Sequence, residues 1–222
     1  MQRIPEPELM DEFDQARAYA AADFSEPNER FVELFLATFP GFDRGTILDL
    51  GCGPGDIALR LAGKLPDVHV HGLDGSQAML DCAGDGLQRR PDLAPRVRFL
   101  RGLLPGCELP LPAYDAVVSN SLLHHLHDPQ VLWRSIRAMG RPGAAVLVMD
   151  LFRPPSLQLA EDIVATYAAG EPEVLRRDFH NSLLAAFEPG EVRAQLAASG
   201  LGELEVRTVS DRHLLVVGHL PG

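Results

Sequence analysis

The sequence predicts an α/β protein whose doubly wound, mainly parallel sheet is covered by helices on both faces. Between residues 46 and 149, short apolar segments alternate with segments of helical spacing, and this alternation is typical of parallel sheets with crossover helices. A Gly-rich turn follows the first expected strand, at the place where doubly wound sheets bind ligands. The length of 222 residues suits one domain.

The individual elements follow from hydrophobic spacing and from turn residues. Strands are expected at residues 46–50, 68–73, 97–100, 116–119 and 144–149. Helices are expected between these strands and again at residues 156–169, 172–186 and 189–199. The tail predicts two further strands that form an antiparallel hairpin at one edge of the sheet, at residues 203–209 and 213–218.

The chain ahead of the first strand indicates a loose Pro- and Glu-rich arm over residues 1–8, followed by helices at residues 9–22 and 28–38. We expect a single domain over residues 1–222. It has an N-terminal helical cap over residues 1–44 and a helical insertion over residues 151–187. Both segments lie outside the strand–helix alternation, so we expect them to cover the substrate.

The charge balance narrows the class of partner. The chain has 20 Lys and Arg against 31 Asp and Glu, a net charge of −11, whereas nucleic acids and anionic membranes attract positive surfaces. The three cysteines show neither a disulfide framework nor zinc-ligand spacing. The N-terminus lacks a signal-peptide pattern. We therefore expect a cytoplasmic protein that binds neither nucleic acid nor membrane, as a monomer or homodimer.

The Gly-rich turn indicates a ligand without phosphates. Gly51 and Gly53 match the start of a dinucleotide fingerprint, but Asp56 stands at the third position, where its carboxylate would repel a pyrophosphate. Asp49 adds an acid at the end of the strand. The pattern favours a ligand that carries an ammonium group, and it disfavours an NAD-dependent oxidoreductase. The alternative is that the glycines only make a tight turn.

Asp74 stands at the end of the second expected strand. An acid at this place in a doubly wound sheet can accept hydrogen bonds from the hydroxyls of a ribose. It can instead cap the following helix, a role for which Ser76 competes. Together with the Gly-rich turn, Asp74 favours a nucleoside site.

Four motifs in order resemble those of class I S-adenosylmethionine (SAM)-dependent methyltransferases over about residues 45–152: ILDLGCGPG, VHGLDGSQAML, YDAVVSNSLLHHLHDP and RPGAAVLVMD. The resemblance implies a seven-stranded sheet with a reversed last strand. It also implies SAM as the cofactor, S-adenosylhomocysteine (SAH) as its product, and methyl transfer to a small-molecule acceptor. Other SAM chemistry (a cyclase or lyase) and a non-catalytic SAM-binding protein remain alternatives.

The resemblance also implies roles for the cofactor residues, each at the position that matches the family motif. Those that contact the methionine part and the sugar are Gly51, Gly53 and Gly55. Asp49 is expected to bind the amino group, and Asp74 is expected to bind the ribose. Gly75 and Met79 are expected to flank the ribose or the adenine. Those near the sulfonium are Asn120 and Ser121. An acid that the family often has after the third strand is missing, and Leu103 and Leu104 are expected to enclose the adenine ring instead.

His124 and His125 are the candidate catalytic groups, because histidine titrates near neutrality and can serve as a general base. The alternative is that one ring only forms a hydrogen bond within its loop. We expect no metal site here, because the histidines, including His127, are tightly spaced and no carboxylate beyond Asp128 is evident.

The acceptor is expected to contact the N-terminal helices and the 150–187 region. The candidate substrate residues are Tyr19, Arg153, Arg177 and Asn181. An arginine here can bind a substrate carboxylate through two parallel hydrogen bonds. The alternative is that this run forms the solvated face and the caps of a helix.

Overall fold

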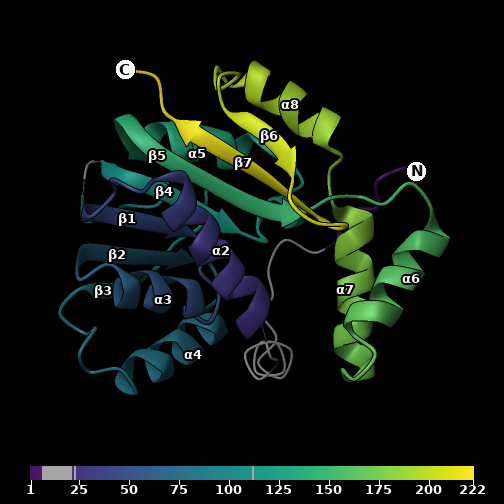
Figure 1. Ribbon diagram of the computed structural model, residues 1–222, viewed down its shortest axis with the longest axis horizontal. Helices are drawn as coiled ribbons and strands as arrows, with labels where there is room; N and C mark the ends of the chain where they lie inside the picture. The colour runs from purple at the N-terminus through teal and green to yellow at the C-terminus, as the bar shows by residue number, and fades with distance from the viewer. Residues whose placement is uncertain (7–21, 23, 112) are drawn as a thin grey trace.

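A seven-stranded sheet of order β3-β2-β1-β4-β5-β7-β6 forms the centre of the computed structural model, as Figure 1 shows. The structure describes residues 1–6, 22, 24–111 and 113–222. The strands are β1 (Arg44–Leu50), β2 (Asp67–Asp74), β3 (Val97–Arg101), β4 (Tyr114–Asn120), β5 (Gly140–Leu151), β6 (Glu205–Thr208) and β7 (His213–His219). Strands β1 to β5 pair in parallel, and β7 is antiparallel to both β5 and β6. The expected doubly wound sheet with a reversed last strand is confirmed.

The central strands are apolar on both sides because helices cover both faces. Ile47 faces one core and its neighbour Leu48 faces the other, and both are fully buried. The same alternation relates Val118 and Val117 on β4. Successive side chains of a strand point to opposite faces, so a strand buried on both faces needs a continuous apolar run. The sequence supplies such a run in each central strand.

Helices α2 (Ser25–Thr38) and α3 (Asp56–Lys64) cover one face of the sheet, with α4 (Gln77–Gln88) packed beside α3. Phe31 and Phe35 of α2 lie in the same core as the sheet residue Ile47. On the opposite face, α5 (Gln130–Met139) and α8 (Pro189–Ala198) pack through Trp133 and Leu196. The helix expected at residues 28–38 is therefore part of this covering layer, whereas the one expected at 9–22 lies outside the described residues.

The 151–187 region forms a lobe beside the carboxyl ends of the central strands (Figure 1). Helices α6 (Leu157–Tyr167) and α7 (Glu173–Ala185) pack against each other in a small separate core that includes Ile163 and Leu183. This is the helical segment that the sequence predicts. No helix among the described residues has the length and apolar character to cross a bilayer.

The start of the chain is bound to this lobe. The backbone N–H of Ile4 donates to the carbonyl oxygen of Leu184 at 3.0 Å, and Arg3 donates to the carbonyl oxygens of Ala185 and His124. The guanidinium of Arg3 also lies 3.9 Å from the ring centroid of Phe187. The prediction of a loose arm is therefore wrong for residues 1–6, because Arg3 contributes several contacts that composition alone does not reveal.

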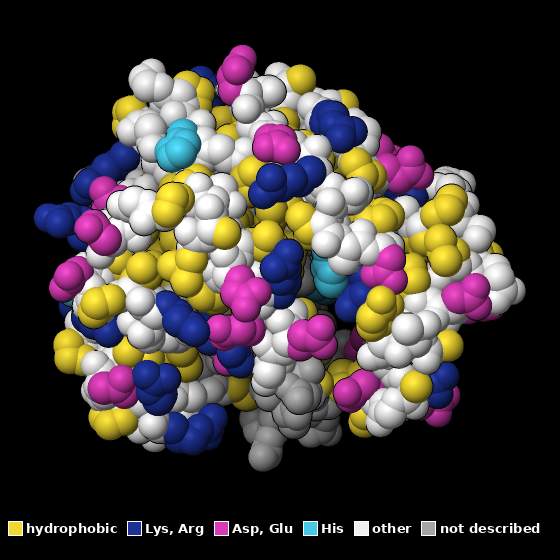
Figure 2. All heavy atoms as spheres, viewed as in Figure 1, with side chains coloured by type: hydrophobic (Ala, Val, Ile, Leu, Met, Phe, Trp, Pro, Cys, Tyr) yellow, Lys and Arg dark blue, Asp and Glu magenta, His cyan; other side chains and the backbone are white. Residues whose placement is uncertain are grey.

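Acidic and basic side chains are interspersed over the face shown in Figure 2. This face has no continuous basic patch of the kind that nucleic-acid-binding proteins present.

Candidate functional site

A cavity of about 590 Å³ opens at the carboxyl ends of β1, β2 and β4. Strand order reverses between β1 and β4, and ligands of doubly wound sheets bind at such a switch point. The volume lies within the range of small-molecule sites, about 300–1,000 Å³. We call it the first cavity. The sequence-predicted residues that line it are Asp49, Gly51, Gly53, Asp74, Gly75, Met79, Leu103, Asn120, Ser121 and His125.

The Gly-rich turn connects β1 to α3 and is anchored to the end of β2. The backbone N–H groups of Gly51 and Cys52 both donate to the carbonyl oxygen of Leu73, at 2.8 and 3.1 Å. Gly53 has φ of +51°, a conformation that favours glycine, and a Cβ atom placed on it would meet nothing within 4 Å. Gly53 therefore presents bare backbone to the cavity, where a ligand can approach closely.

Gly55 has a different role from Gly53. It does not line the cavity, and a Cβ atom on it would lie 2.5 Å from the ring of Phe99. Gly55 is the N-cap residue of α3 and has φ of +81°. Gly55 is thus required for close packing behind the turn. Because it does not line the cavity, it is not among the residues that we propose to contact the cofactor.

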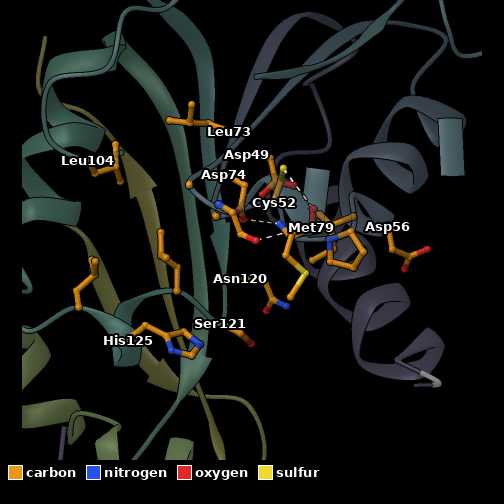
Figure 3. A pocket seen from close by; sticks show the side chains of 18 of the residues that line it. Asp49, Cys52, Asp56, Leu73, Asp74, Met79, Leu104, Asn120, Ser121 and His125 are labelled. Atoms are coloured by element: carbon orange, nitrogen blue, oxygen red, sulfur yellow. Dashed lines mark hydrogen bonds between the residues drawn. The ribbon is translucent and has the colours of Figure 1, made fainter. Parts of the chain in front are cut away.

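Asp74 fixes the geometry of the turn and also borders the cavity. Its Oδ2 accepts a hydrogen bond from the N–H of Gly53 at 2.8 Å, and its Oδ1 accepts one from the N–H of Ser76 at 2.8 Å (Figure 3). Ser76 caps α4 through Met79. A carboxylate oxygen can accept more than one hydrogen bond, and Asp74 also lines the first cavity.

Asp49 is a buried acid that suits a cationic ligand. It is 1 % exposed, and its Oδ2 has no hydrogen-bond partner among the described residues. Burial, with a further contribution from the charge of Asp74, raises the pKa of Asp49 to about 7. A neighbouring cation favours the ionised carboxylate. The side-chain Oδ1 of Asn120 is likewise buried without a hydrogen-bond partner in the described chain.

The donor set therefore fits SAM, which carries an ammonium group, a sulfonium and a ribose but no phosphate. Asp49 and Asn120 provide acceptors that have no hydrogen-bond partner among the described residues, and Asp74 provides a carboxylate for hydroxyls. Cys52 also lines the cavity, but burial raises the pKa of its thiol well above the usual value, so it is not a nucleophile there.

The far end of the first cavity is apolar and belongs to the β3–β4 connection. Gly102 donates its N–H to the carbonyl oxygen of Asp74 at 3.0 Å, which ties this connection to the end of β2. Leu103 and Leu104 line the cavity, as does Met79. Leu103 is 59 % exposed and Leu104 is partly buried, so Leu104 offers the more sheltered contact for an aromatic ring.

A second cavity of about 330 Å³ adjoins the first. The two cavities share five lining residues: Phe24, Asn28, Asn120, Ser121 and His125. Among these, Ser121 has φ of +56°, an uncommon conformation for a residue with a side chain. Such backbone strain is most often found at functional sites. The expected pair Asn120 and Ser121 thus lies at the junction of two cavities.

The second cavity is lined by residues from the start of α2, from η1, from the ends of β5 and α6, from α7 and from the start of β7. The α7 residues that face it are Leu175, Asp178, Phe179 and Ser182. Because these positions recur at helical spacing, the intervening Arg177 and Asn181 point elsewhere and are exposed. Arg177 pairs with Asp178 at the surface. Arg177 and Asn181 therefore line neither cavity, although other residues of α7 line the second one. Tyr19 lies outside the described residues.

Arg153 is a buried structural residue instead of a substrate ligand. It is 6 % exposed and does not line either cavity. Its Nη2 donates to the carboxylates of Glu188 and Glu191 at 3.0 Å each, and Nη1 donates to the carbonyl oxygen of Ala186 at 2.8 Å. Nε donates to the carbonyl oxygen of Met1. These four bonds join the chain start, α7 and α8, and they correct the predicted role.

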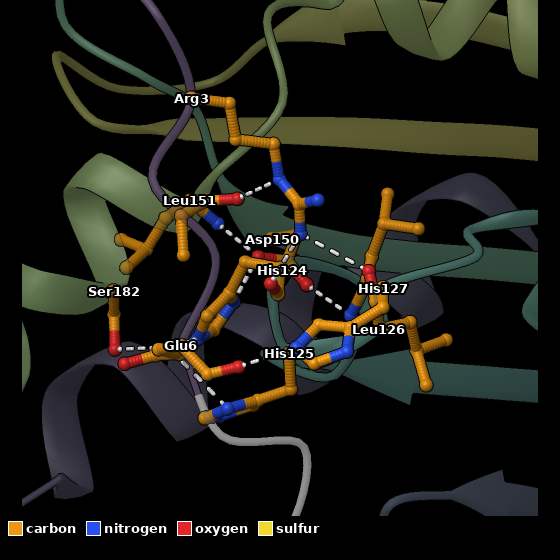
Figure 4. A network of polar contacts seen from close by, with 11 residues as sticks. Arg3, Glu6, His124, His125, Leu126, His127, Asp150, Leu151 and Ser182 are labelled. Atoms are coloured by element: carbon orange, nitrogen blue, oxygen red, sulfur yellow. Dashed lines mark hydrogen bonds and ion pairs between the residues drawn. The ribbon is translucent and has the colours of Figure 1, made fainter.

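His124 and His125 lie in the short 3₁₀ helix η1 (Leu123–His125), next to both cavities. His124 is 3 % exposed; its Nδ1 lies 2.5 Å from Asp150, and its Nε2 lies 3.5 Å from Glu6. Nδ1 of His125 lies 3.3 Å from the same Glu6 oxygen (Figure 4). Burial lowers the pKa of His124, but Asp150 and Glu6 outweigh it and raise the pKa. Burial raises the pKa of Glu6.

Several site residues carry no sequence signal of their own. Glu6 approaches His124 from 118 residues away, and Phe24 and Asn28 reach both cavities from the first turn of α2. Asn28 is positioned by a 2.8 Å hydrogen bond to Asp56. Asp56 therefore positions Asn28, in addition to the expected repulsion between its carboxylate and a phosphate. A polar residue near the start of a helix is recognisable in the sequence, but only the fold shows whether its side chain faces a cavity.

Comparison with known proteins agrees with this architecture. A family model described as a methyltransferase domain matches residues 48–146. An uncharacterised methyltransferase of Mycobacterium tuberculosis is 37 % identical over 112 residues, which cover 50 % of this chain and 53 % of that protein. The aligned part of this chain therefore spans about half the length of that relative. A 2-phytyl-1,4-naphtoquinone methyltransferase of Synechococcus elongatus is 30 % identical over 179 residues, covering 76 % and 74 % of the two chains.

The fold is shared with solved structures at lower identity. A putative SAM-dependent methyltransferase of Methanococcus maripaludis superposes with a TM-score of 0.74 at 19 % identity, and covers 99 % of this chain and 98 % of its own. The chain thus has the fold and the nucleoside-type cavity of a methyltransferase domain. It belongs to the SAM-dependent methyltransferase family, in its class I, Rossmann-like type.

Proposed function

We propose that this protein transfers the methyl group of SAM to a small-molecule acceptor. The observation that carries the proposal is the junction between the two cavities. The first cavity presents Asp49 and Asp74 to a nucleoside with an ammonium group. The second cavity, of about 330 Å³, has room for a small acceptor. Asn120, Ser121 and His125 border both cavities, so cofactor and acceptor meet there.

The residues of the first cavity bind and orient the cofactor. Asp49 takes up the charge of the ammonium group, Asp74 accepts hydrogen bonds from the ribose, and Gly53 lets the ligand lie against the main chain. Gly75, Met79 and Leu104 surround the sugar and the base. SAM, when bound, supplies an electrophilic methyl carbon on a positively charged sulfur. The carboxylates and the exposed main chain of the turn would hold the cofactor so that its methyl group faces the second cavity.

The second cavity aligns the acceptor. Its walls combine apolar residues, Met149 and Phe179 among them, with polar groups such as Asp178 and Ser182. The acceptor atom supplies the electron pair for the new bond to carbon, the carbon–sulfur pair stays on sulfur, and any proton on the acceptor is released to water. Positioning of this kind can contribute about 7–11 kcal/mol in favourable cases.

The size of the second cavity favours a small molecule over a protein or a nucleic acid. The relative from Synechococcus elongatus is named for a naphthoquinone, a small molecule, which supports the same class of acceptor here. The net charge of −11 also makes a nucleic acid an unsuitable partner.

The test incubates the full chain with SAM that carries a deuterated methyl group and with a panel of small molecules bearing phenol, carboxylate, amine and thiol groups. Mass spectrometry is expected to show SAH together with an acceptor that has gained the labelled methyl group. The variant Asn120→Ala is expected to slow this reaction. Asp67→Ala, a change at the exposed start of β2, is the matched control.

Two results would contradict the proposal. If SAM is consumed without a labelled acceptor, the protein cleaves or cyclises SAM instead of transferring its methyl group. If SAM binds and no acceptor class yields SAH, the protein is a non-catalytic SAM-binding protein. Equal rates for Asn120→Ala and Asp67→Ala would place the reaction away from the junction of the cavities.

A further inference from the structure

Glu6, His124 and His125 form a compact cluster, which we call the Glu6 cluster. One ligand-type atom from each residue lies within 4.8 Å of the other two. Figure 4 shows the three side chains pointing toward one another, with Glu6 from the chain start and the two histidines from η1. Both histidines line the second cavity. The cluster therefore borders the space proposed for the acceptor.

The separations in the cluster suit ligands around an ion. Oε1 of Glu6 lies 3.5 Å from Nε2 of His124 and 3.3 Å from Nδ1 of His125. Zinc bonds of about 2.1 Å in a tetrahedral arrangement put neighbouring ligand atoms about 3.4 Å apart. Charge-assisted hydrogen bonds between nitrogen and a carboxylate are shorter, about 2.7–2.9 Å. One carboxylate oxygen thus lies at ligand-to-ligand distance from two imidazole nitrogens.

The surroundings of His124 add an independent argument. Its Nδ1 is paired with the buried Asp150 at 2.5 Å, which leaves Nε2 directed to the cluster. Asp150 is itself fixed by the backbone N–H groups of Leu123 and Leu151, at 2.7 Å each. Metal-bound histidines commonly donate their second ring N–H to a carboxylate in this way, which sets the tautomer and the ring orientation.

The carboxylate of Glu6 is also held in place. Oγ of Ser182 donates to Oε1 of Glu6 at 3.0 Å, and Nε2 of His127 lies 2.9 Å from the carbonyl oxygen of Glu6. Arg3 donates to the carbonyl oxygens of His124 and Leu126, at 2.9 and 3.0 Å. These contacts keep the arm of residues 1–6 against η1. The three side chains are therefore arranged by the fold before any ion arrives.

We propose that Glu6, His124 and His125 bind a divalent transition-metal ion, with Zn²⁺ as the best match. Two imidazoles and one carboxylate suit zinc and related ions better than Mg²⁺, which prefers oxygen ligands. Three protein ligands leave at least one position open for a further ligand. That position, beside the second cavity, takes an anionic oxygen of the acceptor, such as a phenolate or a carboxylate.

The ion would bind the acceptor oxygen and favour its ionised form, because a metal ion lowers the pKa of an oxygen that it binds. This role in acceptor binding rests on the proposed methyl transfer, whereas the ion site itself does not. The inference commits the acceptor to a class: a small molecule that presents an ionisable oxygen next to the methyl group of the cofactor.

The experiment titrates Zn²⁺ and Co²⁺ into the full, metal-stripped chain without SAM or acceptor. Calorimetry is expected to give one site per chain, and Co²⁺ is expected to produce the visible absorption of a low-coordinate nitrogen- and oxygen-ligated ion. Glu6→Gln and His125→Ala are each expected to weaken binding by about 100-fold or more, because removal of even an outer partner of a metal ligand costs about 10–100-fold. His69→Ala, on the exposed start of β2, is the matched control.

Circular dichroism shows whether each variant is folded, and His125→Asn provides a second test at the same position. Absence of stoichiometric binding to the folded wild-type chain would overturn the proposal. Binding of equal strength in wild type, Glu6→Gln and His125→Ala would overturn it as well. Methyl transfer that proceeds unchanged in the metal-stripped chain would leave the ion site standing and would remove its role in acceptor binding.

Discussion

The two cavities differ in how the chain builds them. The first is formed mainly by short segments that directly follow β1, β2, β3 and β4, and most of its polar residues stand in contiguous motifs. The second combines residues from α2, η1, α7 and β7, which are far apart in the chain. The first cavity is therefore largely a local property of the sequence, whereas the second is a property of the tertiary fold.

The comparison also separates two kinds of charged residue. Asp49 and Asp74 are acids on the walls of the first cavity, where Asp74 also binds the backbone N–H groups of Gly53 and Ser76. Around the second cavity, Arg153 and Asp150 are buried and engaged with other protein groups. These two charged residues are thus part of the framework around the second cavity and do not line it. The following predictions test this division, beginning with the largest expected effect.

Arg153→Met is expected to destabilise the fold by about 3 kcal/mol, because it leaves buried carbonyl oxygens and the two glutamates without their partner. SAM affinity of the folded protein is expected to stay the same. Arg177→Ala, at an exposed position, is expected to change stability by about 0.5 kcal/mol at most. Urea unfolding and SAM titration measure both quantities. A stable Arg153→Met protein would contradict the structural role.

Asp74→Ala is expected to weaken SAM binding by about 100-fold, because two hydrogen bonds to a charged group are lost, at about 1.5–3 kcal/mol each less compensation by water. Calorimetric titration gives the affinity. Asp67→Ala, on the opposite end of the same strand, is the control. An affinity that matches wild type would show that Asp74 only braces the turn through Gly53 and Ser76.

A pair of glycine variants distinguishes the inner and outer sides of the turn. Gly55→Ala is expected to cost about 2–4 kcal/mol of stability, because its Cβ would collide with Phe99 and its φ is positive. Gly53→Ala meets open space, so its stability cost is limited to backbone strain of about 1–2 kcal/mol. Its methyl group enters the cavity and is expected to reduce SAM affinity by about tenfold. Thermal unfolding and titration reveal whether the two effects separate as described.

The pH dependence of SAM binding tests Asp49. Its pKa of about 7 in the ligand-free protein falls when a cation binds, so binding releases a proton below pH 7. Affinity is expected to rise as the pH increases toward about 7 and to level off above it, by about tenfold per pH unit at most. Calorimetry in two buffers with different enthalpies of ionisation measures the proton release. Asp49→Asn is expected to lose the dependence, and an unchanged dependence in this variant would exclude Asp49.

The same raised pKa affects the stability of the ligand-free protein. A carboxyl group whose pKa is higher in the folded than in the unfolded chain contributes stability at low pH, and this contribution is lost as the pH rises from about 4 through about 7. Asp49→Asn is expected to be relatively more stable at pH 8 than at pH 5. Urea unfolding at both values checks the sign.

The sequence allowed the sheet, its reversed last strand and most of the first cavity to be predicted, because each depends on short-range patterns. Asp49, Gly53 and Asp74 stand next to strand ends that are recognisable as apolar runs. Gly55 belongs to the same motif but packs against Phe99. No local pattern shows which glycine of the motif faces the ligand and which faces the core.

The acceptor side was less predictable for physical reasons. The hydrogen-bonding groups of Arg177 and Asn181 suggest substrate contacts. The phase of α7, however, directs Asp178 and Ser182 to the second cavity. Glu6 meets His124 and His125 only because Arg3 fixes the arm beside η1. A carboxylate partner for the histidines was therefore not expected from the sequence. Long-range contacts of this kind leave no periodicity and no spacing that a reader of the chain can follow.

The central claim is that one cavity holds the cofactor and that its reactive end opens into the other. The most direct measurement is a crystal structure of the protein with SAH bound. We predict the ribose of SAH beside Asp74 and its sulfur beside Asn120 and Ser121, at the junction with the second cavity. A sulfur atom that points away from that junction, or SAH bound within the second cavity, would contradict this account of the site.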